Sequence, residues 1–254
     1  MRKILSIAST TFGEIARDRI FYSFLIFLFL LMGAAYLASK LSFIAPVRIV
    51  LDFGQTSASL GLALFAIIQG ASNISREYER RTIMLVSSKP VRMIEFVLGK
   101  FFGVAGVLFI NTALLLLVEW IIIRVMEVPG FGAFYLSFFL IFLQSLFLTA
   151  VAMFFISFTT VTLSVVFSVG VFILGCTTTE FLASFSKIDD EGVRSVLHGI
   201  VYSFPSFEGF NLGYRLTYQF PITFNDGFFP FLYTAVYSLF LLFISAHLLK
   251  VKEY

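Results

Sequence analysis

Cysteine, histidine and charged side chains are scarce in this sequence of 254 residues. The chain has one cysteine, Cys176, and two histidines, His198 and His247, and charged residues make up 13% of it. A single cysteine excludes an internal disulfide and any metal site built from several thiolates. Neither histidine has a partner at the spacing that metal ligands need. We therefore expect neither a metal site nor catalytic residues in this chain.

Apolar residues, in contrast, dominate the composition. They make up 59% of the chain, and the mean hydropathy is +0.97, which is more apolar surface than a water-soluble domain of this size can hide in one core. The 35 phenylalanines suit contact with acyl chains, so membrane lipid is an expected partner. The net charge of +3 does not indicate nucleic acid binding, because the basic residues stand at the ends of apolar runs.

Six apolar runs are each long enough to cross a bilayer once, since a spanning helix needs about 20 residues. The fourth and fifth runs come from one uncharged stretch, Val128 to Thr179, which we divide at a turn within Ser157 to Ser164. The sequence predicts an all-α integral membrane protein with a single transmembrane domain over residues 1–254. The predicted spans are residues 20–39, 53–75, 101–122, 134–157, 162–184 and 227–249.

Two segments outside these spans have apolar residues at helical spacing. In residues 1–19 the pattern predicts an amphipathic helix at the membrane interface; its apolar positions are Ile4, Ile7, Ala8, Thr11, Phe12 and Ile15. In the loop 185–226, apolar positions from Val193 to Phe204 predict a second amphipathic helix that ends at Pro205. We expect this second helix to lie on the outer leaflet or to re-enter it.

The distribution of basic residues predicts the orientation. Six spans place both termini on one side, and that side, with the segment 76–100, carries twelve of the eighteen Lys and Arg residues. Because basic residues concentrate in cytoplasmic loops, both termini and the segment 76–100 are predicted to be cytoplasmic. The expected location is the inner (plasma) membrane.

The segment from Arg76 to Lys100 is a charged island between two apolar runs. It holds six of the eighteen basic residues and three of the fifteen acids, so it offers a surface on which a soluble partner can dock. Pro90 disfavours a helical conformation at Lys89 and can begin the next helix. The island is therefore predicted to be a helix, a break and a second helix.

The order of residues in this island resembles the loop between the second and third membrane helices in ABC transporter permeases of the exporter-like type-2 class. The resemblance rests on Arg76-Glu77-x-Glu79-x-Arg81-Thr82-Ile83, on Ser88-Lys89-Pro90-Val91-Arg92 and on Val97-Leu98-Gly99-Lys100-Phe101-x-Gly103. The outer segment from Phe204 to Leu212 and the overall arrangement of six spans are also similar to that family.

The resemblance implies that a short coupling helix, around Glu77 to Ser88, sits in a groove of a separate ATPase subunit. Two permease subunits, either two copies or this chain with a relative, and two ATPases would form the transporter, which moves substrate outward. The residues it implies for coupling are Glu77, Glu79, Arg81, Thr82, Ile83, Met84, Pro90, Arg92 and Lys100.

No phosphate-binding loop of the form G-x-x-x-x-G-K-[ST] occurs in the sequence. Gly99 and Lys100 are preceded by Ile94 where the first glycine belongs, and Phe101 follows where Ser or Thr is needed. ATP and Mg²⁺ are therefore expected on the partner ATPase and not on this chain.

A second set of polar residues lies within the predicted spans and could form a gate or line a substrate pathway: Glu119, Glu180, Asn111 and Gln144. A charged carboxylate at mid-bilayer costs about 2.5 to 3.5 kcal/mol on insertion scales, which favours a functional role. Both acids stand near the outer ends of their spans, where water can reach them, and amides also join helices by hydrogen bonds worth about 0.6 kcal/mol. Packing is therefore an alternative to a pathway.

Two other function classes remain open at this stage. The first alternative is a non-transporting membrane scaffold or sensor whose charged island recruits a soluble cytoplasmic partner. The second is a membrane-embedded enzyme, for which Ser164 and Ser168 stand one helical turn apart but have no histidine near them in sequence.

Overall fold

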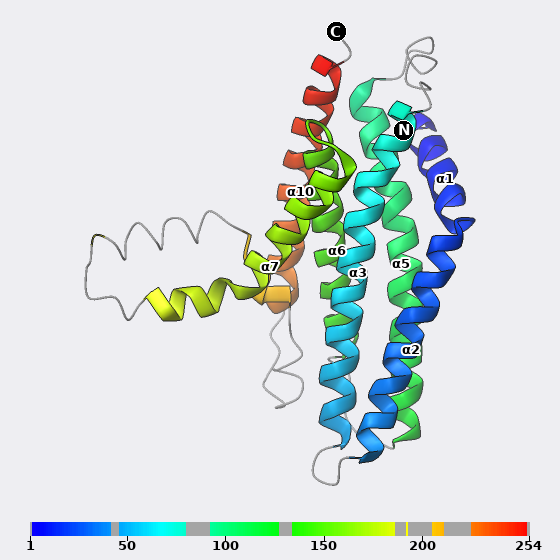
Figure 1. The fold of residues 1–254 in the computed structure, drawn as a ribbon, viewed down its shortest axis with the longest axis vertical. Helices are drawn as coiled ribbons and strands as arrows, with labels where there is room; N and C mark the ends of the chain where they lie inside the picture. The colour runs from blue at the N-terminus through cyan, green and yellow to red at the C-terminus, as the bar shows by residue number, and fades with distance from the viewer. Residues whose placement is uncertain are drawn as a thin grey trace.

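A computed structural model describes residues 2–41, 46–79, 92–126, 134–185, 192, 205–210 and 225–252. Most of these residues are helical, and no strand occurs among them. The elements are α1 (Arg2–Ala16), α2 (Arg19–Leu41), α3 (Pro46–Glu79), α5 (Met93–Val125), α6 (Phe134–Ile156), α7 (Val161–Phe185), η1 (Glu208–Phe210) and α10 (Asn225–Lys252). The long helices run side by side, and the first turn of α1 and the last turn of α10 lie at the same end of the bundle (Figure 1).

Six of these helices, α2, α3, α5, α6, α7 and α10, are long and apolar enough to cross a membrane. This confirms the predicted all-helical, multi-pass membrane protein. The turn between the fourth and fifth spans also falls where it was predicted, since α6 ends at Ile156 and α7 begins at Val161.

Two helices extend beyond the predicted membrane spans. Helix α3 runs from Pro46 to Glu79, past both ends of the predicted span 53–75, and α5 begins at Met93, before the predicted span 101–122. Charged residues end an apolar run but not a helix, because the backbone hydrogen bonds continue and the charged side chains find partners on neighbouring helices. Both flanks of the island 76–100 therefore belong to the ends of long helices.

Parts of the prediction fall outside the described residues. These parts are residues 80–91, with Arg81, Thr82, Ile83, Met84 and Pro90, and the predicted outer helix over Val193 to Phe204. Glu79 lies in the last turn of α3, but its side chain is also outside the described set. The predicted coupling helix is thus a prediction that the described residues do not test.

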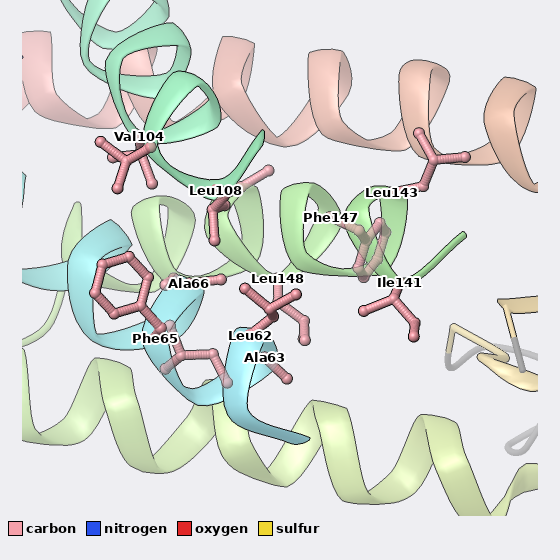
Figure 2. Close-up of a cluster of buried hydrophobic side chains, with 14 of the residues drawn as sticks. Leu62, Ala63, Phe65, Ala66, Val104, Leu108, Ile141, Leu143, Phe147 and Leu148 are labelled. Carbon is pink, nitrogen blue, oxygen red and sulfur yellow. The ribbon is translucent and has the colours of Figure 1, made fainter. Parts of the chain in front are cut away.

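Helix α6 is the most enclosed of the six, and it packs against α3, α5, α7 and α10. Around it, Leu62 and Phe65 of α3, Leu108 of α5 and Leu148 of α6 form one buried apolar cluster (Figure 2). Gly70 lets α3 approach α6 closely, because a Cβ at this position would lie 2.9 Å from the backbone oxygen of Thr149. This packing fixes α3 in position, and α3 in turn carries one flank of the island.

Candidate functional site

Helix α1 packs in parallel along the first turns of α5. Three glycines of α5 face it: a Cβ added to Gly99 would meet Ile7, one added to Gly103 would meet Thr11, and one added to Gly106 would meet Phe12. At Gly103 that Cβ would also lie 2.9 Å from the backbone oxygen of Ala8. Because these glycines have no side chains, the side chains of α1 pack directly on the backbone of α5.

The face of α1 that meets α5 is the face that the sequence predicts to be apolar. Thr11 and Ile15 are buried, and the other four predicted positions are partly shielded, whereas Arg2, Lys3 and Glu14 are exposed. A protein surface covers this face, so the helix is a packed element of the bundle. Its position relative to a membrane interface stays a prediction.

Lys100 joins three helices near the end of the bundle that holds both termini. Its side chain is 4% exposed, and its Nζ lies 2.8 Å from Oε1 of Glu77 in α3 and 3.7 Å from Oε2 of Glu14 in α1. The ammonium also lies 5.9 Å from the centre of the Phe96 ring. A buried ammonium is expensive unless it is paired, so Lys100 ties α1 and the end of α3 to the start of α5.

A second ion pair lies close by in the chain. Arg76 Nη2 donates to Asp18 Oδ2 at 3.0 Å, joining the last turns of α3 to the junction between α1 and α2. The Arg76 side chain is 43% exposed, so this pair adds little to stability. The pair is a second link between α3 and the junction of α1 with α2.

The start of α5 is set by Arg92 and Glu95. The backbone N–H of Arg92 donates to Oε2 of Glu95 at 3.0 Å, which is half of a capping box. The Arg92 side chain itself is exposed. Of the residues predicted for coupling, Arg92 therefore lies at the surface, whereas Glu77 and Lys100 form an ion pair with each other inside the bundle.

The polar residues predicted for a pathway do not form one continuous group. Gln144 is buried, and its Oε1 accepts a hydrogen bond from Ser59 at 3.0 Å. This contact favours a packing role for Gln144 over a place in a substrate pathway. Glu180 is exposed in the last turns of α7, and the end of this helix turns away from the bundle (Figure 1). Asn111 is buried in α5, and neither its amide nitrogen nor its amide oxygen has a hydrogen-bond partner among the described residues.

Glu119 differs from the other three because it carries a potential charge and is fully enclosed. Its relative exposure is 0%, and neither carboxyl oxygen has a hydrogen-bond partner in the part of the chain that the structure describes. The carboxyl lies against Gly54 of α3, where an added Cβ would come within 3.0 Å of Cδ. Water access therefore does not explain this acid, although the sequence left that possibility open.

The sequence did not identify Phe207 as an important residue. Its ring is buried, packs edge-on to Phe147 of α6 at 5.5 Å and lies 6.2 Å from Phe172 of α7. Its backbone N–H donates to the oxygen of Gly175 at 3.0 Å, and a Cβ on Gly175 would collide with the ring. Phe207 thus anchors the segment between α7 and α10 inside the bundle.

Among the described residues, no group of three or more His, Cys, Asp or Glu side chains is placed to hold a metal ion. What these residues do form is a mechanical junction of α1, α3 and α5 around Lys100, with a separate enclosed carboxyl further along α5. In comparisons with known proteins, no protein-family model matches this chain and no curated protein matches it.

Proposed function

We propose that this chain is the membrane subunit of an ATP-driven transporter of the ABC type, and that residues 76–100 connect it to a separate ATPase. The proposal rests on the resemblance of the island and on one structural observation. The two helix ends that flank residues 80–91 are tied to each other, and to α1, at the buried side chain of Lys100.

This junction suits the transmission of force. A partner that moves the segment 80–91 pulls on the end of α3 and the start of α5, and the contact between Lys100 and Glu77 makes these ends move together. Because α1 packs on the glycines of α5, it follows them. ATP binding by the partner would then favour one orientation of the spans, and hydrolysis would release it.

The rest of the proposal follows the family. ATP and Mg²⁺ bind the partner ATPase, a second permease copy or a relative completes the transporter, and substrate moves outward between the two sets of spans. Both termini and the island face the cytoplasm at the inner (plasma) membrane, which accords with the positive charge at that end.

The test is co-purification of the full chain, extracted from its native membrane, with an ATPase identified by mass spectrometry. Arg81→Glu and Arg92→Glu are expected to reduce the amount of ATPase that accompanies the chain. Arg124→Glu is the matched control, since Arg124 is exposed at the other end of α5, with its guanidinium 5.2 Å from the Trp120 ring. Equal ATPase recovery with all three variants would contradict the docking proposal.

Glu77 is a poor first choice for this test. Its carboxylate holds the buried Lys100, so charge reversal there disturbs the bundle itself as well as any docking surface. The same purification separates the alternative function: a scaffold or sensor would bring down a soluble protein that lacks a nucleotide-binding motif.

A further inference from the structure

The carboxyl of Glu119 has no partner for a negative charge. Within the described residues, neither oxygen accepts a hydrogen bond and no ion pair reaches the side chain. Enclosure by protein removes water as well, since the residue has no exposed surface. An ionised carboxylate in this position is unfavourable, whereas a protonated carboxyl carries no charge.

The helices around Glu119 offer no compensating cation there. The first turns of α6, from Phe134 to Leu140, contain no charged residue, and the charges of α1 lie at the other end of α5, where Glu14 faces Lys100. Among the described residues of α2, α3, α5 and α10, the charged groups at the same end of the bundle are exposed or only partly buried. These groups are Lys40 of α2, Arg48 and Asp52 of α3, Arg124 of α5 and Asp226 of α10.

The Glu119 carboxyl packs directly against α3 at Gly54. An added Cβ at Gly54 would lie 3.0 Å from Cδ and Oε2 of Glu119 and 3.1 Å from Oε1. The carboxyl therefore occupies the space that a side chain at position 54 would fill. Ionisation would draw water to this contact, and water can enter only if α3 and α5 separate.

A proton fits this site better than a metal ion does. Asn111, the nearest unpartnered amide along α5, lies two turns away, or about 12 Å along the helix axis, so it cannot share an ion with Glu119. Oε1 of Gln55 already accepts a hydrogen bond from Ser137 at 2.9 Å. Nε2 of Gln55, in the turn of α3 that contains Gly54, has no hydrogen-bond partner among the described residues, so it does not donate to the Glu119 carboxyl.

From these observations we propose that Glu119 is a proton-binding site that closes the contact between α3 and α5 when the proton is bound and opens it when the proton leaves. The proton comes from bulk water on closing and returns to bulk water on opening, so no other reactant is needed. This inference goes beyond the transport function and does not depend on it. It would give the bundle a response to pH at the end opposite Lys100.

The sign of the pH effect follows from linkage. The packed state holds a proton that the opened state gives up, so the packed state becomes less stable as pH rises. The purified full chain should therefore melt at a lower temperature as pH rises through the titration of Glu119. Glu119→Gln, which is neutral at every pH, should remove this dependence, whereas Glu180→Gln, a matched change at an exposed acid, should leave it intact.

A second measurement needs no variant. A hydrophobic carbodiimide, which reacts with protonated carboxyls in apolar surroundings, is added to the wild-type chain in vesicles of neutral lipid across a pH series. Modification located by mass spectrometry should be several-fold higher at Glu119 than at Glu180 at acid pH, and it should fall as pH rises.

The melting comparison decides the proposal if Glu119→Gln folds. A variant that melts with the same pH dependence as the wild type overturns the proposal. If the variant does not fold, the labelling decides, and modification of Glu119 that is absent, or no greater than that of Glu180, at acid pH overturns it. Neither measurement involves an ATPase, so failure here is distinct from failure of the docking proposal.

Discussion

The pair formed by Lys100 and Glu77 allows the sharpest test of the junction between α1, α3 and α5. Glu77→Gln keeps the shape of the side chain but removes the charge that lies 2.8 Å from a lysine with 4% exposure. Removing one partner of a buried pair costs about 3 to 5 kcal/mol, because the other charge stays buried and uncompensated.

Two features of the structure lower this value. Glu77 is 20% exposed, so water already screens part of the interaction, and Glu14 remains as a second acid 3.7 Å from Nζ. We therefore expect Glu77→Gln to lower the free energy of unfolding by about 2 kcal/mol. Lys100→Met should cost less, because it removes the buried charge itself and leaves Glu77 able to reach water.

The assay is thermal melting of the purified chain in one detergent, scored as the rank order of variants. The predicted order of stability is wild type, then Lys100→Met, then Glu77→Gln, and the double variant should be more stable than Glu77→Gln alone. Glu180→Gln, at an exposed position, is the control and should melt as the wild type does. A Lys100→Met variant that melts below Glu77→Gln, or a Glu77→Gln variant without effect, would refute the reasoning.

Three further predictions test the packing. Gly103→Val should detach α1 from α5, because even a Cβ at position 103 would lie 2.6 Å from Cβ of Thr11. A cysteine placed at position 11 in a Cys176→Ala background should then react faster with a maleimide. Gly13→Ala is the control and should not change this rate, because a Cβ at position 13 would meet nothing within 4 Å. Phe207→Ala should lower the free energy of unfolding by about 3 to 5 kcal/mol, measured by melting. Phe229→Ala, at an exposed position, should lower it only a little. Equal losses of stability in the two variants would contradict the anchoring role. Gly54→Ala should lower the melting temperature, and adding Glu119→Ala to the same chain should restore part of the lost stability. If the stability losses of the two single variants simply add in the double variant, the two residues do not compete for one space.

The spans could be predicted because each follows from a local property, the length of an apolar run. The helices extend past these apolar runs, because a helix continues wherever charged side chains find partners, as Lys100 does with Glu77. The contact of Gly99 and Gly103 with α1 could not be predicted, because nothing local in the sequence shows which helix packs on them.

The candidate site was predictable to a similar degree. An acid inside an apolar run marked Glu119, but its enclosure depends on Gly54, which is distant in sequence and became a neighbour only through folding. Phe207 lies in the segment Phe204 to Leu212 that resembles the permease family, but nothing in the sequence distinguished this phenylalanine from the other 34. Its importance comes from the gap at Gly175 that its ring fills.

The central claim is that the segment between α3 and α5 docks an ATPase, and site-specific photo-cross-linking tests it most directly. A photoreactive residue at Ile83 or Met84 in the full chain, irradiated in its native membrane, should capture a polypeptide that contains a phosphate-binding loop. The same residue at Ile121, exposed near the far end of α5, should not capture it. Cross-links from positions 83 and 84 only to lipid, to this chain or to proteins without a nucleotide-binding motif would contradict the claim.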